Sequence, residues 1–236
     1  MRILIIPDVH LKPSMFTRAA QLLEQGEAGR AVCLMDLADD WDCMFNLDLY
    51  IQTYDRAIDF ARAYPDTLWC WGNHDVCYLW NQRESGYSPP AAGTVCRRLA
   101  ELREALPDPG KLAFLHRVDR VLFSHAGLCE TFVRDHAGDL PEEDTDAVIE
   151  RINSLGPTEL WQDLSPIWYR HSYDKDALYR AGDLLQVAGH TPVRKIRRKE
   201  NLIECDVFST RPDKRPYGNR QFPVLDTLTW EYRGIT

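Results

Sequence analysis

Three short apolar runs in the N-terminal part of the chain predict strands buried on both faces, at residues 2–6, 30–35 and 67–71. The segments between these runs have helical spacing. One begins after Pro13, where Ser14 can cap it, and the other extends from Leu47 to Ala61 and is stopped by Pro65. This alternation implies parallel strands whose carboxyl ends meet at one edge of an α/β sheet.

The second half of the chain has a less regular pattern. Residues 112–115 and 120–124 indicate a hairpin that ends at His125. Helical spacing predicts helices at 145–155 and 158–164, and an apolar run predicts a strand at 184–188. From Arg194 onward we expect β-hairpins, with strands at 202–208, 222–225 and 228–232. These segments should form a second sheet that packs on the first.

Length and composition fit one folded unit. A chain of 236 residues with 44% hydrophobic content can bury one sizeable core, and it shows no internal repeat, low-complexity tract or linker. We therefore expect a single domain over residues 1–236.

Charge and cysteine usage narrow the partners and the compartment. The formal net charge of -8 opposes general binding to nucleic acid or to an anionic membrane, so a phosphate substrate must be attracted locally, as by metal cations. No stretch reaches the roughly 20 apolar residues that span a bilayer, and the short first apolar run predicts no signal segment. The seven scattered cysteines predict reduced thiols. Together these features predict a cytoplasmic protein.

Five polar islands carry the candidate chemistry, because each follows an apolar run. They are Asp8-Val9-His10, Asp36-Leu37-Ala38-Asp39, Gly72-Asn73-His74-Asp75, Ser124-His125-Ala126-Gly127 and Gly189-His190-Thr191-Pro192. The islands would bring carboxylate, amide and imidazole groups to the ends of neighbouring strands, where Asp36 could bridge two divalent metal ions. This arrangement predicts a hydrolase.

Each island alone has a simpler interpretation. Asp8 and His10 would point the same way in an extended chain, but that spacing is weak evidence for a metal site. Asp36 could cap the following helix, and Gly72-Asn73-His74 could be a tight turn with an exposed histidine. The later histidines could be structural. The metal site is favoured because four of the seven histidines stand at predicted strand ends, with carboxylates in a consistent order.

The order of these motifs resembles the calcineurin-like metallophosphoesterase superfamily, which has D-x-H, G-D-x-x-D, G-N-H-[DE], a histidine before a small residue, and G-H-[TS]. The resemblance covers residues 1–206. Its last motif is most similar to the branch that contains serine/threonine protein phosphatases and bacterial diadenosine tetraphosphate hydrolases. It implies a four-layer α/β/β/α sandwich of two mixed β-sheets flanked by helices, with a dinuclear metal centre.

The resemblance also implies a role for each residue. The expected ligands are Asp8, His10 and Asp36 for the first metal, and Asp36, Asn73, His125 and His190 for the second. A metal-bridging hydroxide would attack phosphorus, His74 would protonate the leaving oxygen, and Asp39 would orient that imidazole. Asn73 is also expected to bind substrate. Manganese is the first expectation for both ions, and iron, zinc or nickel would also suit these ligands.

Two positions depart from the family pattern, which usually reads G-D-x-x-D-R-G. Met35 replaces the glycine, and Asp40 replaces a phosphate-clamping arginine. Asp40 and Asp42 are interpreted as solvated loop charges. Arg170 follows Trp168-Tyr169 in a segment similar to one that supplies a substrate-binding arginine in bacterial members, although it could equally be a surface residue. Arg83 is a weaker substitute.

These features predict a metal-dependent phosphoester hydrolase, more narrowly a phosphomonoesterase similar to serine/threonine phosphatases. Its substrate would be a phosphoprotein, a nucleotide or a small phosphoester. The alternatives are a dinucleoside polyphosphate hydrolase, a phosphodiesterase, or a metal-binding scaffold without activity. The basic run at residues 194–199 could hold an acidic partner or RNA, but is favoured as the solvated face of a hairpin. His116, His136 and His171 are expected to be structural.

Overall fold

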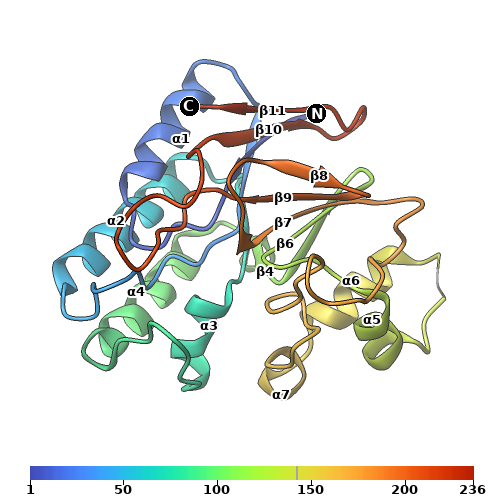
Figure 1. Ribbon diagram of the computed structural model, residues 1–236, viewed down its shortest axis with the longest axis horizontal. Helices are drawn as coiled ribbons and strands as arrows, with labels where there is room; N and C mark the ends of the chain where they lie inside the picture. The colour runs from blue at the N-terminus through green and yellow to red at the C-terminus, as the bar shows by residue number, and fades with distance from the viewer. Residues whose placement is uncertain (142) are drawn as a thin grey trace.

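The computed structural model describes residues 1–141 and 143–236, and it arranges them in four layers (Figure 1). Two mixed β-sheets lie face to face in the middle. Helices α1, α2 and α4 cover the outer face of one sheet, and α5, α6 and α7 lie beside the other. The α/β/β/α sandwich that the family resemblance implied is confirmed.

The first sheet is six-stranded, with the order β11-β10-β1-β2-β3-β4. Its strands are β1 (Arg2–Ile6), β2 (Arg30–Cys33), β3 (Leu68–Cys70), β4 (Leu112–Ala113), β10 (Phe222–Asp226) and β11 (Tyr232–Ile235). Strands β1 to β4 are parallel, β10 pairs with β1 in the antiparallel direction, and β11 pairs antiparallel with β10. The helical segments that connect the first four of these strands are α1 (Ser14–Glu24), α2 (Leu47–Ala63), α3 (Asn73–Trp80), η1 (Pro89–Ala91), α4 (Ala92–Ala105) and η2 (Pro109–Lys111).

The second sheet is five-stranded, with the order β5-β6-β7-β9-β8. Its strands are β5 (Leu115–Val118), β6 (Val121–Ser124), β7 (Leu185–Pro192), β8 (Arg197–Lys199) and β9 (Leu202–Asp206). Strands β6, β7 and β9 are parallel, and β5 and β8 are antiparallel edges. The helices on this side are α5 (Glu130–Ala137), α6 (Thr145–Asn153) and α7 (Pro157–Leu160).

Strand β1 shows how the layers are held together. Its residues alternate between the two faces of the sheet, so Ile3 and Ile5 enter the core between the sheets while Leu4 and Ile6 pack toward the helices. All four side chains are completely buried. This double burial explains the continuous apolar run at the start of the sequence.

Most of the predicted elements are present. The strand predicted at 228–232 begins only at Tyr232, after a turn, and two further differences concern which sheet a strand joins. Residues 112–115 do not form one strand, because β4 pairs with β3 in the first sheet and β5 begins the hairpin in the second. The last hairpin, β10 and β11, joins the first sheet beside β1 and not the second sheet. It pairs with the backbone groups of β1 that face away from β2.

Further differences concern the helices. Pro13 and not Ser14 occupies the N-cap of α1, without a side-chain cap. Helix α7 is one turn, shorter than the predicted 158–164. Helices α3, α4 and α5 were not predicted. None of the helices formed by the described residues has the length and apolar character needed to cross a bilayer.

Candidate metal centre

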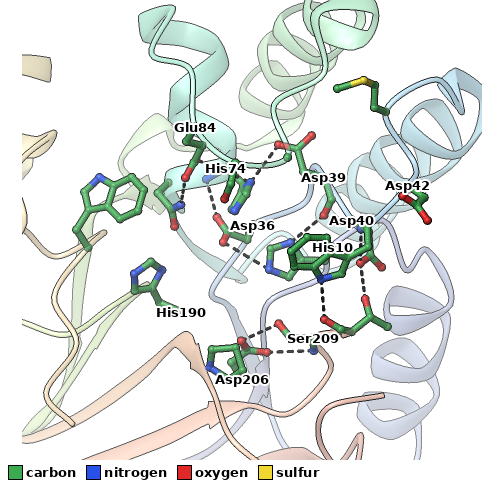
Figure 2. A pocket seen from close by; sticks show the side chains of 18 of the residues that line it. His10, Asp36, Asp39, Asp40, Asp42, His74, Glu84, His190, Asp206 and Ser209 are labelled. Carbon is green, nitrogen blue, oxygen red and sulfur yellow. Dashed lines mark hydrogen bonds and ion pairs between the residues drawn. The ribbon is translucent and has the colours of Figure 1, made fainter. Parts of the chain in front are cut away.

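The five polar islands converge at the carboxyl ends of the strands, where residues of all but the fourth line one pocket and His125 of the fourth is buried beside Asp36. Figure 2 shows side chains from distant parts of the chain turned toward the pocket, among them His10, Asp36, His74 and His190. The cavity has a volume of about 590 Å³. Parallel strands explain the convergence, because β1, β2 and β3 in one sheet and β6 and β7 in the other have their carboxyl ends at the same edge. The fifth island, 189–192, is the carboxyl end of β7 itself, and Asn73 and His74 begin α3 directly after β3.

Asp36 lies at the centre of the cluster. Its Oδ2 atom is 3.2 Å from His125 Nε2 and 3.7 Å from His10 Nε2, and its Oδ1 accepts the backbone N–H of His74 at 2.9 Å. Two groups of potential ligand atoms, each within 4.8 Å of one another, share this residue; they are His10, Asp36 and His74, and Asp36, His125 and His190. The carboxylate is therefore placed between two possible cation positions.

Asp8 and Asn73 complete the expected set. Asp8 Oδ2 accepts the backbone N–H of His190 at 2.7 Å and lies 4.0 Å from His125 Nε2. Asn73 Oδ1 lies 3.0 Å from the same imidazole nitrogen. The geometry expected for Asp8 and His10 is wrong in one respect, because β1 ends at Ile6 and His10 has a φ of 42°. A loop, and not an extended strand, presents the two side chains.

Backbone carbonyls orient two of the imidazoles. His10 Nδ1 donates to the carbonyl of Asp39 at 2.9 Å, and His125 Nδ1 donates to the carbonyl of Leu34 at 2.8 Å. Since a carbonyl oxygen only accepts, the proton of each neutral ring is on Nδ1 and the lone pair is on Nε2. Both Nε2 atoms face the Asp36 carboxylate, the orientation that metal-ligating histidines usually have.

The residues fit a pair of divalent cations. Asp8 Oδ1 and His190 Nε2 are buried and have no hydrogen-bond partner among the described residues, although buried polar atoms are nearly always paired. Close backbone approach is also built in. A Cβ atom on Gly72 would lie 2.1 Å from Asp36 Oδ1, and one on Gly189 would lie 1.8 Å from Asp8 Oδ1. Carboxylate, amide and imidazole donors suit manganese, iron, zinc or nickel.

Burial and crowded charges shift the pKa values of these groups in opposite directions. Burial, with Asp206 and Asp36 nearby, raises the pKa of Asp8 well above its usual range. Burial also acts to raise the pKa of Asp36, but the neighbouring His125 and His74 lower it. Burial and His125 lower the pKa of His190. Two cations at this point would offset the crowding of buried carboxylates.

His74 has the contacts expected of a proton donor. Its Nδ1 donates to Asp39 Oδ2 at 3.0 Å. Asp39 Oδ1 in turn accepts the hydroxyls of Tyr50 at 2.7 Å and Tyr78 at 2.6 Å. Burial acts to lower the pKa of His74, yet the carboxylates of Asp36, Asp39 and Glu84 raise it to about 10. A protonated imidazole is therefore the stable form in the absence of bound cations.

Of the two arginines considered for phosphate binding, the structure brings only Arg170 to the pocket. Its Nη1 donates to the carbonyl of His190 at 2.8 Å, which fixes the guanidinium beside the cluster. Arg83 is not among the residues that line the cavity, and its guanidinium lies 6.0 Å from the ring centroid of Tyr87.

The interpretation of Asp40 as a solvated charge is wrong. Asp40 lines the pocket, is partly buried, and accepts hydrogen bonds from Lys12 at 2.9 Å and from the Thr210 hydroxyl. Burial acts to raise the pKa of Asp40, but Lys12 lowers it. Asp42 is exposed, as interpreted, and lies 3.6 Å from Lys214.

Two acidic residues of the pocket were missed. Glu84 accepts a hydrogen bond from Asn73 Nδ2 at 2.8 Å, and Asp206 accepts one from the Ser209 hydroxyl at 2.8 Å. Asp206 ends strand β9 and could have been found by the same strand-end rule as the islands. Glu84 lies in a loop without a comparable signal. The other three histidines lie outside the pocket lining: His116, His136 and His171.

Comparisons with known proteins identify the family and the fold. The family model described as calcineurin-like phosphoesterase matches residues 1–214. The fold is similar to a cold-active protein-tyrosine phosphatase of a psychrophilic Shewanella species, with a TM-score of 0.58 and 14% identity over 100% of this chain and 80% of that one. It is also similar to a protein serine/threonine phosphatase from Saccharomyces cerevisiae, with a TM-score of 0.52 and 12% identity over 95% and 72% of the two chains.

No curated protein sequence matches the chain. At such low identities the two solved structures show a shared fold, while the family model, which spans most of the chain, shows the family. The chain therefore belongs to the calcineurin-like phosphoesterase family, and it is a metal-dependent phosphoester hydrolase.

Proposed function

We propose that this protein is a dinuclear-metal phosphomonoesterase. The observation that carries the proposal is the position of Asp36, which is shared by two groups of potential ligand atoms. The residues assigned to the first ion are Asp8, His10 and Asp36, and those assigned to the second are Asp36, Asn73, His125 and His190. When bound, the two ions would supply positive charge to the phosphoryl oxygens and acidify a water molecule. Manganese is the first metal to test.

The chain's own residues then divide the remaining work. His74 is assigned as the general acid that gives its Nε2 proton to the leaving oxygen, since its Nδ1 is held by Asp39. Tyr50 and Tyr78 hold Asp39 in turn. Arg170 is assigned to the phosphoryl oxygens, which its fork of N–H groups can bind in pairs. Asn73 is assigned to both a metal and the substrate.

The charges of the pocket favour a phosphomonoester over a dinucleoside polyphosphate. Among the described residues of the lining, Arg170 is the one arginine or lysine. Six lining residues carry carboxyl groups; they are Asp36, Asp39, Asp40, Asp42, Glu84 and Asp206. In a chain of several phosphates, the additional negative charges would lie near these carboxylates and would have no cationic partner in the lining. A single phosphoryl group can be bound by the metals and Arg170.

The experiment compares metal-loaded wild type with His74→Asn on two substrates. p-Nitrophenyl phosphate has a leaving group that needs no proton, whereas an alkyl phosphate does. We expect turnover of both by the wild type, and in His74→Asn a fall of roughly 100-fold or more for the alkyl phosphate with a much smaller fall for p-nitrophenyl phosphate. Steady-state kinetics with metal content measured on the same samples provides the readout.

The matched control is Arg170→Ala, which should retain metal and slow both substrates alike because the phosphoryl group is common to them. Equal losses on both substrates in His74→Asn would refute the general-acid assignment. Absence of turnover by a wild type that holds two ions would favour the scaffold alternative. A preference for phosphodiesters in the same assay would favour that enzymatic alternative.

A further inference from the structure

Large apolar side chains are exposed at one end of the pocket. Trp41, Met44 and Phe45 lie in the loop between β2 and α2, and all three line the cavity. The exposed fractions are 51% for Trp41 and 79% for Phe45. Exposed aromatic side chains at the mouth of a polar pocket are typical of a ligand contact surface.

The ring of Trp41 is held in place although half of it is exposed. Its Nε1 donates to the carbonyl of Thr210 at 2.9 Å, and its backbone N–H donates to Asp40 Oδ1 at 2.8 Å. The Thr210 hydroxyl and Lys12 also bind Asp40. The Thr210 carbonyl therefore holds the indole directly, and Asp40, which stands where an arginine was expected, binds the Thr210 hydroxyl and the Trp41 backbone. A fixed ring loses little conformational entropy when a ligand contacts it.

This aromatic end of the pocket lies on the side of His74. The Lys12 ammonium group that binds Asp40 also donates to the carbonyl of His10, whose ring is 5.1 Å from that of His74. The hydroxyl of Ser88 ties the Met44 carbonyl to the loop that covers His74.

Arg170 and Trp168 instead contact His190. Figure 2 agrees, since His190 lies to one side and Asp40 and Asp42 lie to the other, with His10 and His74 between them.

We propose that Trp41 and Phe45 form a subsite for a flat aromatic ring carried by the leaving group of the substrate. The proposal rests on the proposed function, because the assignment of His74 as proton donor defines the leaving-group side. The subsite takes a ring without further phosphates, since no arginine or lysine among the described lining residues stands at this end. A nucleobase or a phenyl ring would meet this description.

The test uses propyl phosphate and 3-phenylpropyl phosphate as a matched pair. Both release a primary alkoxide, so the pair isolates the ring from the chemistry of the leaving oxygen. We expect metal-loaded wild type to prefer the ring-bearing ester by roughly tenfold or more in kcat/KM, which corresponds to about 1.4 kcal/mol. Trp41→Ala and Phe45→Ala should each lower that ratio severalfold, whereas Trp41→Phe should keep most of it.

Tyr173→Ala is the control, because Tyr173 is 75% exposed and does not line the pocket. Its ratio should equal that of the wild type. A second arm distinguishes a nucleobase from a phenyl ring with two further substrate pairs. Adenosine 5′-monophosphate is compared with ribose 5-phosphate, and tyrosine O-phosphate is compared with serine O-phosphate. The ring that the subsite takes is the one in the pair whose kcat/KM ratio changes in Trp41→Ala.

The outcomes separate the two proposals. Equal kcat/KM values for propyl and 3-phenylpropyl phosphate would refute the subsite, and so would a ring preference that is unchanged in both Trp41→Ala and Phe45→Ala. Either result would be compatible with the proposed phosphomonoesterase activity. No hydrolysis of either ester by the wild type would refute the proposed function itself.

Discussion

Gly72 and Gly189 are required at the site because a side chain at either position would displace an acidic residue of the metal centre. Neither has a positive φ, so their role is not conformational freedom. A Cβ atom at either position would overlap a carboxylate oxygen, that of Asp36 or that of Asp8. The glycines in the third and fifth islands are therefore explained by the space that the acidic side chains occupy.

This explanation predicts that Gly72→Ala loses metal without losing the fold. The added methyl group would force Asp36 out of its position between the two ligand groups. We expect metal content per protein to fall severalfold, with an unchanged far-ultraviolet circular dichroism spectrum. Gly93→Ala is the control, since nothing lies within 4 Å of its Cβ position in α4, and should stabilise the fold by about 0.5–1 kcal/mol. Full metal content in Gly72→Ala would contradict the explanation.

His116 gives the fold a dependence on pH that is separate from the metal centre. Burial lowers the pKa of His116 from 6.5 to about 4, although a hydrogen bond from its Nε2 to the Trp69 carbonyl acts to raise it. The unfolded chain therefore takes up this proton first. The contribution of neutral His116 to stability is complete above the unfolded pKa and is lost as the pH falls from 6.5 toward 4.

The expected loss between about pH 7 and about pH 5 is about 2 kcal/mol. Urea unfolding of wild type and His116→Gln at both pH values measures it, because the glutamine can keep a donor but does not titrate. The difference in unfolding free energy between the two proteins should shift by that amount. An identical pH dependence in both would show that the folded pKa of His116 is not depressed.

Much of the site could be predicted residue by residue, and the exceptions have physical reasons. The ligand types follow from polar residues at strand ends, and the structure brings all six expected ligands together. Asp40 could not be interpreted correctly, because its partner Thr210 is far away in sequence. The hydroxyls of Tyr50 and Tyr78 act at the site while their rings follow the apolar pattern of a core, so periodicity gives no sign of their contact with Asp39.

At the scale of elements, a single amide side chain binds the backbone where the chain passes from one sheet to the other. Asn153, the last residue of α6, accepts the backbone N–H groups of Phe114 and Leu115 at 3.0 and 2.9 Å, and it donates to the Leu115 carbonyl at 3.0 Å. These bonds serve the backbone between β4 and β5. The apolar run alone indicated one continuous strand, since it contains no sign of a partner so far along the chain.

Asn153→Ala should therefore destabilise the protein by about 2–3 kcal/mol, because it leaves partly buried N–H groups unpaired at the crossing. Urea unfolding at neutral pH measures the effect. Ser154→Ala is the control on the neighbouring exposed residue, with an expected change within about 0.5 kcal/mol. Equal losses of unfolding free energy in Asn153→Ala and Ser154→Ala would show that Asn153 does not stabilise the segment between β4 and β5.

At the scale of the whole molecule, the two sheets share one core. Side chains from β1, β2 and β3 pack between the sheets against those of β6, β7 and β9. Neither sheet can lose its partner without exposing this completely apolar layer to water. We therefore propose that residues 1–236 form one cooperative domain, as the length and composition suggested.

A single unfolding transition is the expected consequence. Tryptophan fluorescence reports on both halves of the domain, since Trp69 lies in the first sheet and Trp161 and Trp168 pack with the apolar core between the second sheet and its helices. Circular dichroism reports on all helices and strands. The midpoints of the two signals in urea should coincide. Two separate transitions would show that the sheets unfold independently.

The pairing of β1 with β10 has a consequence for how the protein is made. Leu4 faces Val224 across this ladder, so one edge of β1 lacks its partner strand until β10 and the whole segment between the two strands have been translated. Until then, an apolar strand with free backbone groups is open to wrong neighbours. The contact between β1 and β10 therefore forms late in folding, and chains truncated before β10 should depend on chaperones.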